Sequence, residues 1–76
     1  MDEMTEFEEM YIKRIFEEHY RAPDEIVRTS QLADKMGVSS ASVTEMIQRL
    51  AARDLVTYIP YKGCRLTPNG FHLGAI

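Results

Sequence analysis

The amino-acid sequence predicts a mainly α-helical domain with a small β-hairpin. Two short segments of helical apolar spacing, residues 29–36 and 39–53, are separated by little more than one glycine. After Asp54 the apolar period becomes two, as in strands, and Thr67-Pro68 then supplies a cap and a first-turn proline for another helix. This order of elements predicts a winged helix-turn-helix over residues 1–76.

The first helix is expected over residues 5–20. Thr5 with Glu8 three positions later is a capping-box pattern. The apolar residues at helical spacing, expected to face the core, are Phe7, Met10, Tyr11, Ile15 and Phe16. The carboxylates expected on a solvated face are Glu8, Glu9, Glu17 and Glu18. The helix is expected to end near Tyr20, because a breaker sequence with Pro23 follows.

A helix-turn-helix is expected at about residues 29–53. Residues 26–28 are β-prone and short enough for a single edge strand. Thr29 or Ser30 is then expected to cap the next helix, and Gly37 is expected at its left-handed C-cap. Ser39 can cap the following helix, whose inward stripe is expected to be Val43, Met46, Ile47 and Leu50. Short polar side chains on the other positions leave that helix accessible near its N-terminus.

A hairpin, or wing, is expected at about residues 55–67. Val56 and Tyr58 alternate along one strand until Pro60, and Cys64 resumes the pattern after a basic turn at 61–63. A last helix is expected over 67–76, as the start of a linking helix. It is still apolar at Ile76, which is expected either of a truncated chain or of a helix that docks onto another chain.

The charge is unevenly distributed. Residues 1–27 carry nine acids against three bases, a net charge of -6, and residues 28–65 carry six bases against three acids, a net charge of +3. Phosphate contact by so modest an excess is expected to be weak and sensitive to salt.

Duplex DNA is the partner that this order of elements favours. A helix fits the major groove, where each base pair shows a distinct donor and acceptor pattern, and the helix N-terminus at Ser39 attracts phosphate. Lys62 and Arg65 would lie over the backbone beside that helix. Ser39 could equally serve only as a cap. The alternative function is a protein-interaction module that uses the acidic face of the first helix and the apolar end of the last.

Other function classes lack support in the sequence. It contains no nucleophile-base pair and no glycine-rich phosphate loop, so neither an enzyme nor a small-molecule substrate is expected. Cys64 is expected to be a small strand residue, and His19 and His72 to be surface or partly packed side chains. Neither a membrane span nor a secretory signal is found, so a cytoplasmic location is expected.

The sequence also resembles the metal-dependent repressors typified by the diphtheria toxin repressor and the manganese transport regulators. The strongest motifs are Ser42-Val43-Thr44-Glu45-Met46-Ile47 and Tyr61-Lys62-Gly63 with Leu66-Thr67. Further matching segments are Glu9-Met10-Tyr11-Ile12, Val27-Arg28-Thr29-Ser30-Gln31-Leu32-Ala33, Gly37-Val38-Ser39, Gln48-Arg49-Leu50, Leu55-Val56-Thr57-Tyr58 and Gly70. The resemblance covers nearly the whole chain.

The resemblance implies a transcription repressor that binds an operator in double-stranded DNA as a homodimer when Fe2+ or Mn2+ is present. By position, the residues that would face base edges are Ser39, Ala41 and Glu45. Those that would hold phosphates are Thr29, Ser42, Thr44, Arg49 and Lys62. Some members of the family have proline and glutamine at positions 41 and 45; a glutamate favours the cytosine amine, whereas glutamine suits adenine.

Met10 is the one metal-ligand position of the family that this resemblance places within the chain. The other ligands and the dimerisation domain are expected to lie outside residues 1–76. A methionine at this spacing is also an ordinary core residue of an amphipathic helix. Manganese-type members have carboxylates at positions 10 and 13, where this chain has Met10 and Lys13, and a thioether suits a softer metal, so the resemblance favours iron.

Overall fold

The computed structural model describes residues 4–74, which form a winged helix-turn-helix. Helix α1 spans Glu6–Arg21, strand β1 Val27–Arg28, helix α2 Thr29–Met36 and helix α3 Ser40–Ala52. Strand β2 spans Val56–Ile59, strand β3 Gly63–Leu66 and helix α4 Pro68–Gly74. The predicted fold class is therefore confirmed. The last two residues expected in the final helix lie outside the described residues.

A capping box opens α1, as predicted. The backbone N–H of Glu8 donates to Thr5 Oγ1 at 3.1 Å, and the N–H of Thr5 donates to Glu8 Oε1 at 2.9 Å. The predicted inward stripe is wrong in part, because Phe7 is 66% exposed and Met10 is 51% exposed. The buried face of α1 includes two carboxylates instead, Glu8 and Glu18.

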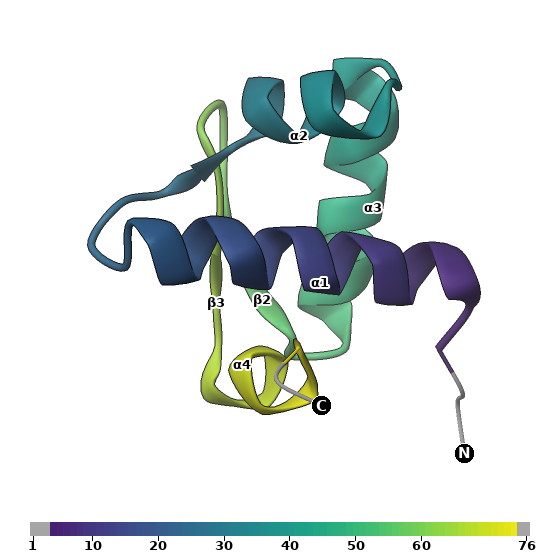
Figure 1. The fold of residues 1–76 in the computed structure, drawn as a ribbon. Coiled ribbons are helices and arrows are strands. Elements are labelled where there is room, and N and C mark those ends of the chain that lie inside the picture. Colours follow the sequence, from purple (N-terminus) through teal and green to yellow (C-terminus); the bar gives the residue numbers. More distant parts are fainter. Residues whose placement is uncertain (1–3, 75–76) are drawn as a thin grey trace.

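The three strands form one antiparallel sheet in the order β1-β3-β2. Val27 of β1 pairs with Cys64 of β3, which in turn pairs with Tyr58 of β2. Strand β1 is an edge strand, as expected, although it contains only Val27 and Arg28. In Figure 1 the β2–β3 hairpin extends from α4 to the level of α2, and α1 crosses it. Strand β1, which directly precedes α2 in the chain, thus joins the wing to the helix-turn-helix.

The turn between α2 and α3 has the predicted left-handed glycine, since Gly37 has φ 69°. Ser39 is the N-cap of α3, and its Oγ accepts from the backbone N–H of Ser42 at 3.1 Å. The cap predicted for α2 is wrong, because Arg28 holds that position and donates its backbone N–H to Gln31 Oε1 at 3.1 Å. Helix α2 follows β1 without a break, so Thr29 and Ser30 are already helical.

The core lies where α1, α2 and α3 meet the inner face of the sheet. Its fully buried side chains, all less than 2% exposed, include Ile15, Leu32, Val43, Ile47 and Leu50. Helix α4 packs on α1, where Phe71 contacts Phe16 with ring centroids 5.1 Å apart. Among residues 4–74, no helix has the length and apolar character needed to cross a bilayer.

Candidate nucleic-acid interface

A groove runs between the wing and the N-terminal ends of α2 and α3. Its lining combines hydroxyl groups with two cationic side chains and contains no carboxylate. The lining residues are Arg28, Thr29, Ser30, Ser40, Thr44, Tyr58, Tyr61 and Lys62. Side chains of this kind suit a sugar-phosphate strand, which offers anionic oxygens to several donors at once.

Backbone contacts hold the wing tip against α2. The N–H of Thr29 donates to the carbonyl oxygen of Lys62 at 3.1 Å, and the N–H of Lys62 donates to the carbonyl oxygen of Ile59 at 3.0 Å. Gly63 makes this approach possible, because a Cβ on that residue would lie 1.9 Å from the carbonyl oxygen of Val27. Lys62 is therefore presented from a turn with a fixed position relative to α2.

Helix α3 presents a small, polar face to solvent. Val43, Ile47 and Leu50 are buried and fix which side of the helix faces the core. At about 100° per residue, Ala41 and Glu45 fall opposite this buried stripe, and both are exposed. These two are among the three residues that the resemblance assigns to base edges, and they share the centre of the accessible face; the third, Ser39, is the N-cap of the helix.

The residues expected to hold phosphates lie on the two flanks of that face. Thr44 is on the flank beside the wing, because it lines the groove together with Lys62 and Thr29. Ser42 and Arg49 are exposed and, from the helical period, lie on the opposite flank. A helix seated in a major groove has a phosphate strand on each side, so this division into centre and flanks matches the geometry of DNA.

The hydroxyl groups of Ser39 and Ser42 are already joined. Ser39 Oγ accepts from the backbone N–H of Ser42 and donates to Ser42 Oγ, both at 3.1 Å. The proton of Ser39 is thus used within the protein, whereas the hydroxyl proton of Ser42 remains available to an external acceptor. Ser39 therefore acts as the cap of α3, which was one of the two roles expected for it.

Two ion pairs hold α1 against the helix-turn-helix. Glu8 is 3% exposed and accepts from Arg53 Nη1 at 3.1 Å, just beyond the C-terminus of α3. Glu18 is 6% exposed; it pairs with Arg21 at 3.1 Å and with Lys35, in the last turn of α2. The expectation that both carboxylates are solvated is wrong, because distant basic residues compensate their burial.

The pKa of Glu8 is lowered from its ordinary value. The backbone N–H of Thr5 is the main cause, because it donates to the carboxylate. The positive charges of Arg53 and Arg49 lower this pKa further, while burial opposes them. The charge of Arg49, which lies on the exposed flank of α3, thus also acts on the buried carboxylate of Glu8.

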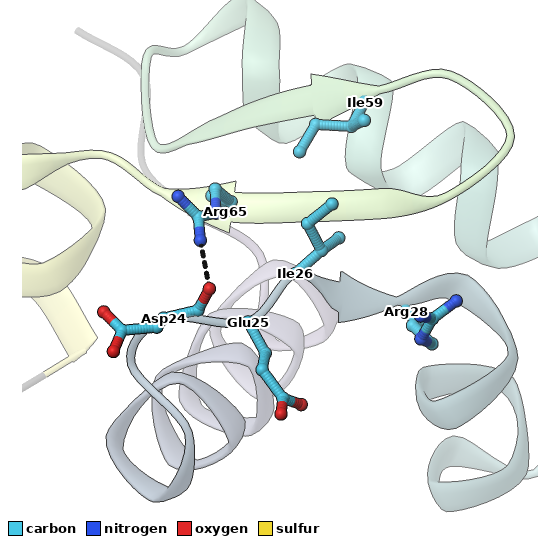
Figure 2. Close-up of a pocket in the computed structure, with 6 residues that line it drawn as sticks. All are labelled: Asp24, Glu25, Ile26, Arg28, Ile59 and Arg65. Atoms are coloured by element: carbon cyan, nitrogen blue, oxygen red, sulfur yellow. Dashed lines mark hydrogen bonds between the residues drawn. The ribbon is translucent and has the colours of Figure 1, made fainter.

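Arg65 lies away from the groove. Its Nη2 donates to the carbonyl oxygen of Asp24 at 2.6 Å, on the outer face of the sheet. Figure 2 shows its guanidinium directed at Asp24, in a hollow that Ile26 and Ile59 also line. The expectation that Arg65 would join Lys62 over the DNA backbone is therefore not supported, since Arg65 does not line the groove and its guanidinium binds Asp24.

The remaining candidate side chains do not form a site by themselves. Cys64 is fully buried, which raises the pKa of its thiol to about 12, so it is a packed strand residue, as expected. His19 packs edge-on against Phe71 at 5.9 Å. Within the part of the chain that the structure describes, no three His, Cys, Asp or Glu side chains are grouped so as to hold a metal ion. Met10 is too exposed to be the core residue that its spacing suggested.

Four residues of the groove were not among those expected to contact DNA. They are Arg28, Ser30, Tyr58 and Tyr61, whereas Ser40 had been expected among the short polar side chains at the N-terminus of α3. Arg28 and Ser30 flank Thr29 in the chain, and Tyr61 precedes Lys62, so adjacency to predicted positions was the available signal for these three. Their convergence depends on the pairing of β1 with β3, which no local pattern predicts.

Comparisons with known proteins agree with this geometry. Residues 3–64 match the model of the family described as "Iron dependent repressor, N-terminal DNA binding domain". The chain is 40% identical over 47 residues to the HTH-type transcriptional regulator MntR of Listeria welshimeri, covering 62% of this chain and 33% of that protein. The proteins of the same name from Lysinibacillus sphaericus and Geobacillus thermodenitrificans are 40% and 38% identical over 47 residues. The match thus spans about a third of the length of these relatives.

Proposed function

Because the chain belongs to the iron-dependent repressor family through the N-terminal DNA-binding domain of that family, we propose that it is the DNA-binding part of a metal-dependent transcription repressor. The observation that carries this proposal is the groove between the wing and the two helix N-termini, with its hydroxyl and cationic lining. The domain acts by binding rather than by catalysis, and its partner is an operator in double-stranded DNA.

Helix α3 enters the major groove with its small face toward the bases. Ala41 and Glu45 occupy the centre of that face, and Ser39 lies at its N-terminal end. The Glu45 carboxylate accepts a hydrogen bond from a cytosine amine, while Ala41 leaves room for close approach. Since the Ser39 hydroxyl also caps α3, it contributes less to base selection than Glu45.

Phosphate contacts hold α3 in this position from both flanks. On the wing side the contacts are made by Lys62, Thr29 and Thr44, and Arg28 joins them from the end of β1. On the other side Arg49 pairs with a phosphate and Ser42 donates its free hydroxyl proton. These contacts supply affinity and orientation without sequence information.

The metal acts through residues that lie partly outside the described chain. Met10 is half exposed on α1, so its thioether is accessible as one ligand, but no complete donor set accompanies it among the described residues. Thioether donation favours Fe2+ over Mn2+. In the whole protein, which is a cytoplasmic homodimer in this proposal, metal binding would change the affinity for the operator.

An anisotropy titration of a labelled duplex tests the DNA proposal. Selection from a random duplex pool first yields the preferred sequence, which the chain is expected to bind more tightly than mixed-sequence duplex. The affinity is expected to fall by roughly 0.9 log unit per log unit of salt for each phosphate contacted. Reversing the charges of Arg49 and Lys62 is expected to abolish binding, and reversing the charge of exposed Lys13 serves as control. If no sequence is enriched and the reversals have no effect, the DNA proposal fails and the alternative of a protein-interaction module is favoured.

A further inference from the structure

Tyr61 stands at the tip of the wing with its side chain entirely in solvent. It is 103% exposed, the highest value among the large hydrophobic residues whose side chains the structure describes. Among residues 4–72, whose side chains are described, none forms a hydrogen bond or ring contact with Tyr61. The ring therefore contributes nothing evident to the stability of the fold.

The backbone of Tyr61 is left-handed, with φ 67°. The turn requires this conformation, because the N–H of Lys62 must return to the carbonyl oxygen of Ile59. Glycine or asparagine adopts such a conformation at much lower cost than an aromatic residue does. The turn explains the conformation of residue 61, but it does not explain why a tyrosine occupies this position.

The position of Tyr61 beside the groove gives the explanation. Tyr61 lines the same groove as Lys62, Thr29 and Thr44, which the proposed function assigns to a phosphate strand. The wing tip is fixed to α2 by the hydrogen bond from Thr29 to Lys62, so the ring is presented from a rigid support. An exposed and strained residue at a ligand-facing position is typical of a binding contact.

We propose that the Tyr61 ring packs against the deoxyribose of the DNA strand in this groove, beside the phosphate held by Lys62. This inference rests on the proposed function and adds an apolar contact to an interface otherwise made of hydroxyls and charges. The contact reads no base, because every nucleotide offers the same sugar. It increases affinity for all duplexes alike.

Substitution of Tyr61 separates this role from a structural one. With a fluorescein-labelled mixed-sequence duplex at low salt, Tyr61→Gly is expected to weaken binding roughly tenfold, which corresponds to the loss of about 60 Å² of apolar contact. The thermal midpoint of Tyr61→Gly is expected to be unchanged or a few degrees higher, since glycine relieves the left-handed strain. Tyr61→Phe is expected to bind within about twofold of the original chain. Tyr20→Ala, at a tyrosine that is 75% exposed on α1, is the control and is expected to retain full affinity.

Four other outcomes would each overturn either the proposed function or the role of Tyr61. If the unmodified chain binds no duplex, the proposed function fails. If Lys62→Gln weakens binding and Tyr61→Gly does not, only the present inference fails. A parallel loss of stability and affinity in Tyr61→Gly would show a structural role and overturn it. A loss in Tyr61→Phe equal to that in Tyr61→Gly would overturn packing of the ring in favour of a hydrogen bond from the hydroxyl.

Discussion

Removal of the negative charge of Glu8 is expected to weaken the attachment of α1 to α3. In Glu8→Gln the amide oxygen can still accept from the N–H of Thr5 and from Arg53 Nη1, which share Oε1 of Glu8, but the negative charge that pairs with Arg53 at 3.1 Å is lost. A hydrogen bond to a charged group contributes about 1.5–3 kcal/mol, against about 0.5–1.5 for a neutral one. Since the Arg53 side chain is 25% exposed and partly screened, the expected loss is about 1 kcal/mol.

The assay is thermal unfolding followed by circular dichroism. For a domain of this size, a loss of about 1 kcal/mol lowers the unfolding midpoint by roughly 4–8 °C. Glu9→Gln is the matched control, because Glu9 is the next residue on α1 and is exposed. Its midpoint is expected to stay within about 2 °C of the original.

The pH dependence gives the stricter test. Because the pKa of Glu8 is lowered by folding, its charge stabilises the folded chain at pH values above its ordinary value of 4.5. This contribution is lost as the pH falls through the lower pKa of the folded state. The difference between the original chain and Glu8→Gln is therefore expected to shrink at about pH 3. An equal difference at about pH 3 and about pH 7 would refute the electrostatic explanation.

Four further experiments test other parts of the structure. Gly63→Ala places a Cβ 1.9 Å from a backbone oxygen of β1, so the wing must separate from β1. The free energy of unfolding measured in urea is expected to fall by about 3 kcal/mol. Near-normal stability would contradict the close approach of the two strands. Lys62→Gln is expected to reduce the salt dependence of DNA binding by roughly 0.9 log unit per log unit, and an unchanged slope would remove Lys62 from the phosphate contacts. The buried Cys64 thiol, whose pKa is about 12, is expected to react with an aromatic disulfide reagent only when the chain unfolds; rapid labelling of the native chain would count against its burial. Ser39→Ala is expected to cost about 1 kcal/mol through loss of the α3 cap, and Ser40→Ala almost nothing; equal losses would show that the cap is not specific to Ser39.

Local patterns in the sequence were enough to place the elements of this fold. The capping box at Thr5, the left-handed Gly37 and the cap at Ser39 are all found as predicted, because each depends on residues within one or two turns. The periodic stripe of α3 was also largely predicted, as Val43 and Ile47 are buried. The same periodicity left the other positions of α3 accessible, whereas their roles at the DNA interface are what the family resemblance implies.

The orientation of α1 and the composition of the groove depended on tertiary contacts. The apolar stripe predicted for α1 included Phe7 and Met10, but the buried face contains Glu8 and Glu18 instead. Periodicity counts a carboxylate as a surface residue, whereas here Arg53 and Lys35 compensate the two charges from positions far along the chain.

The sequence by itself determined the order of the helices and strands and which residues of α3 are accessible. Only the tertiary structure decided which distant residues share a surface: the pairing of β1 with β3 brings Arg28 beside Lys62, and the carbonyl oxygen of Asp24 binds the guanidinium of Arg65 away from Lys62. The physical reason is one of range. Caps and periodicity act over a few residues, whereas strand pairing and buried ion pairs join residues whose separation in the sequence carries no local signal.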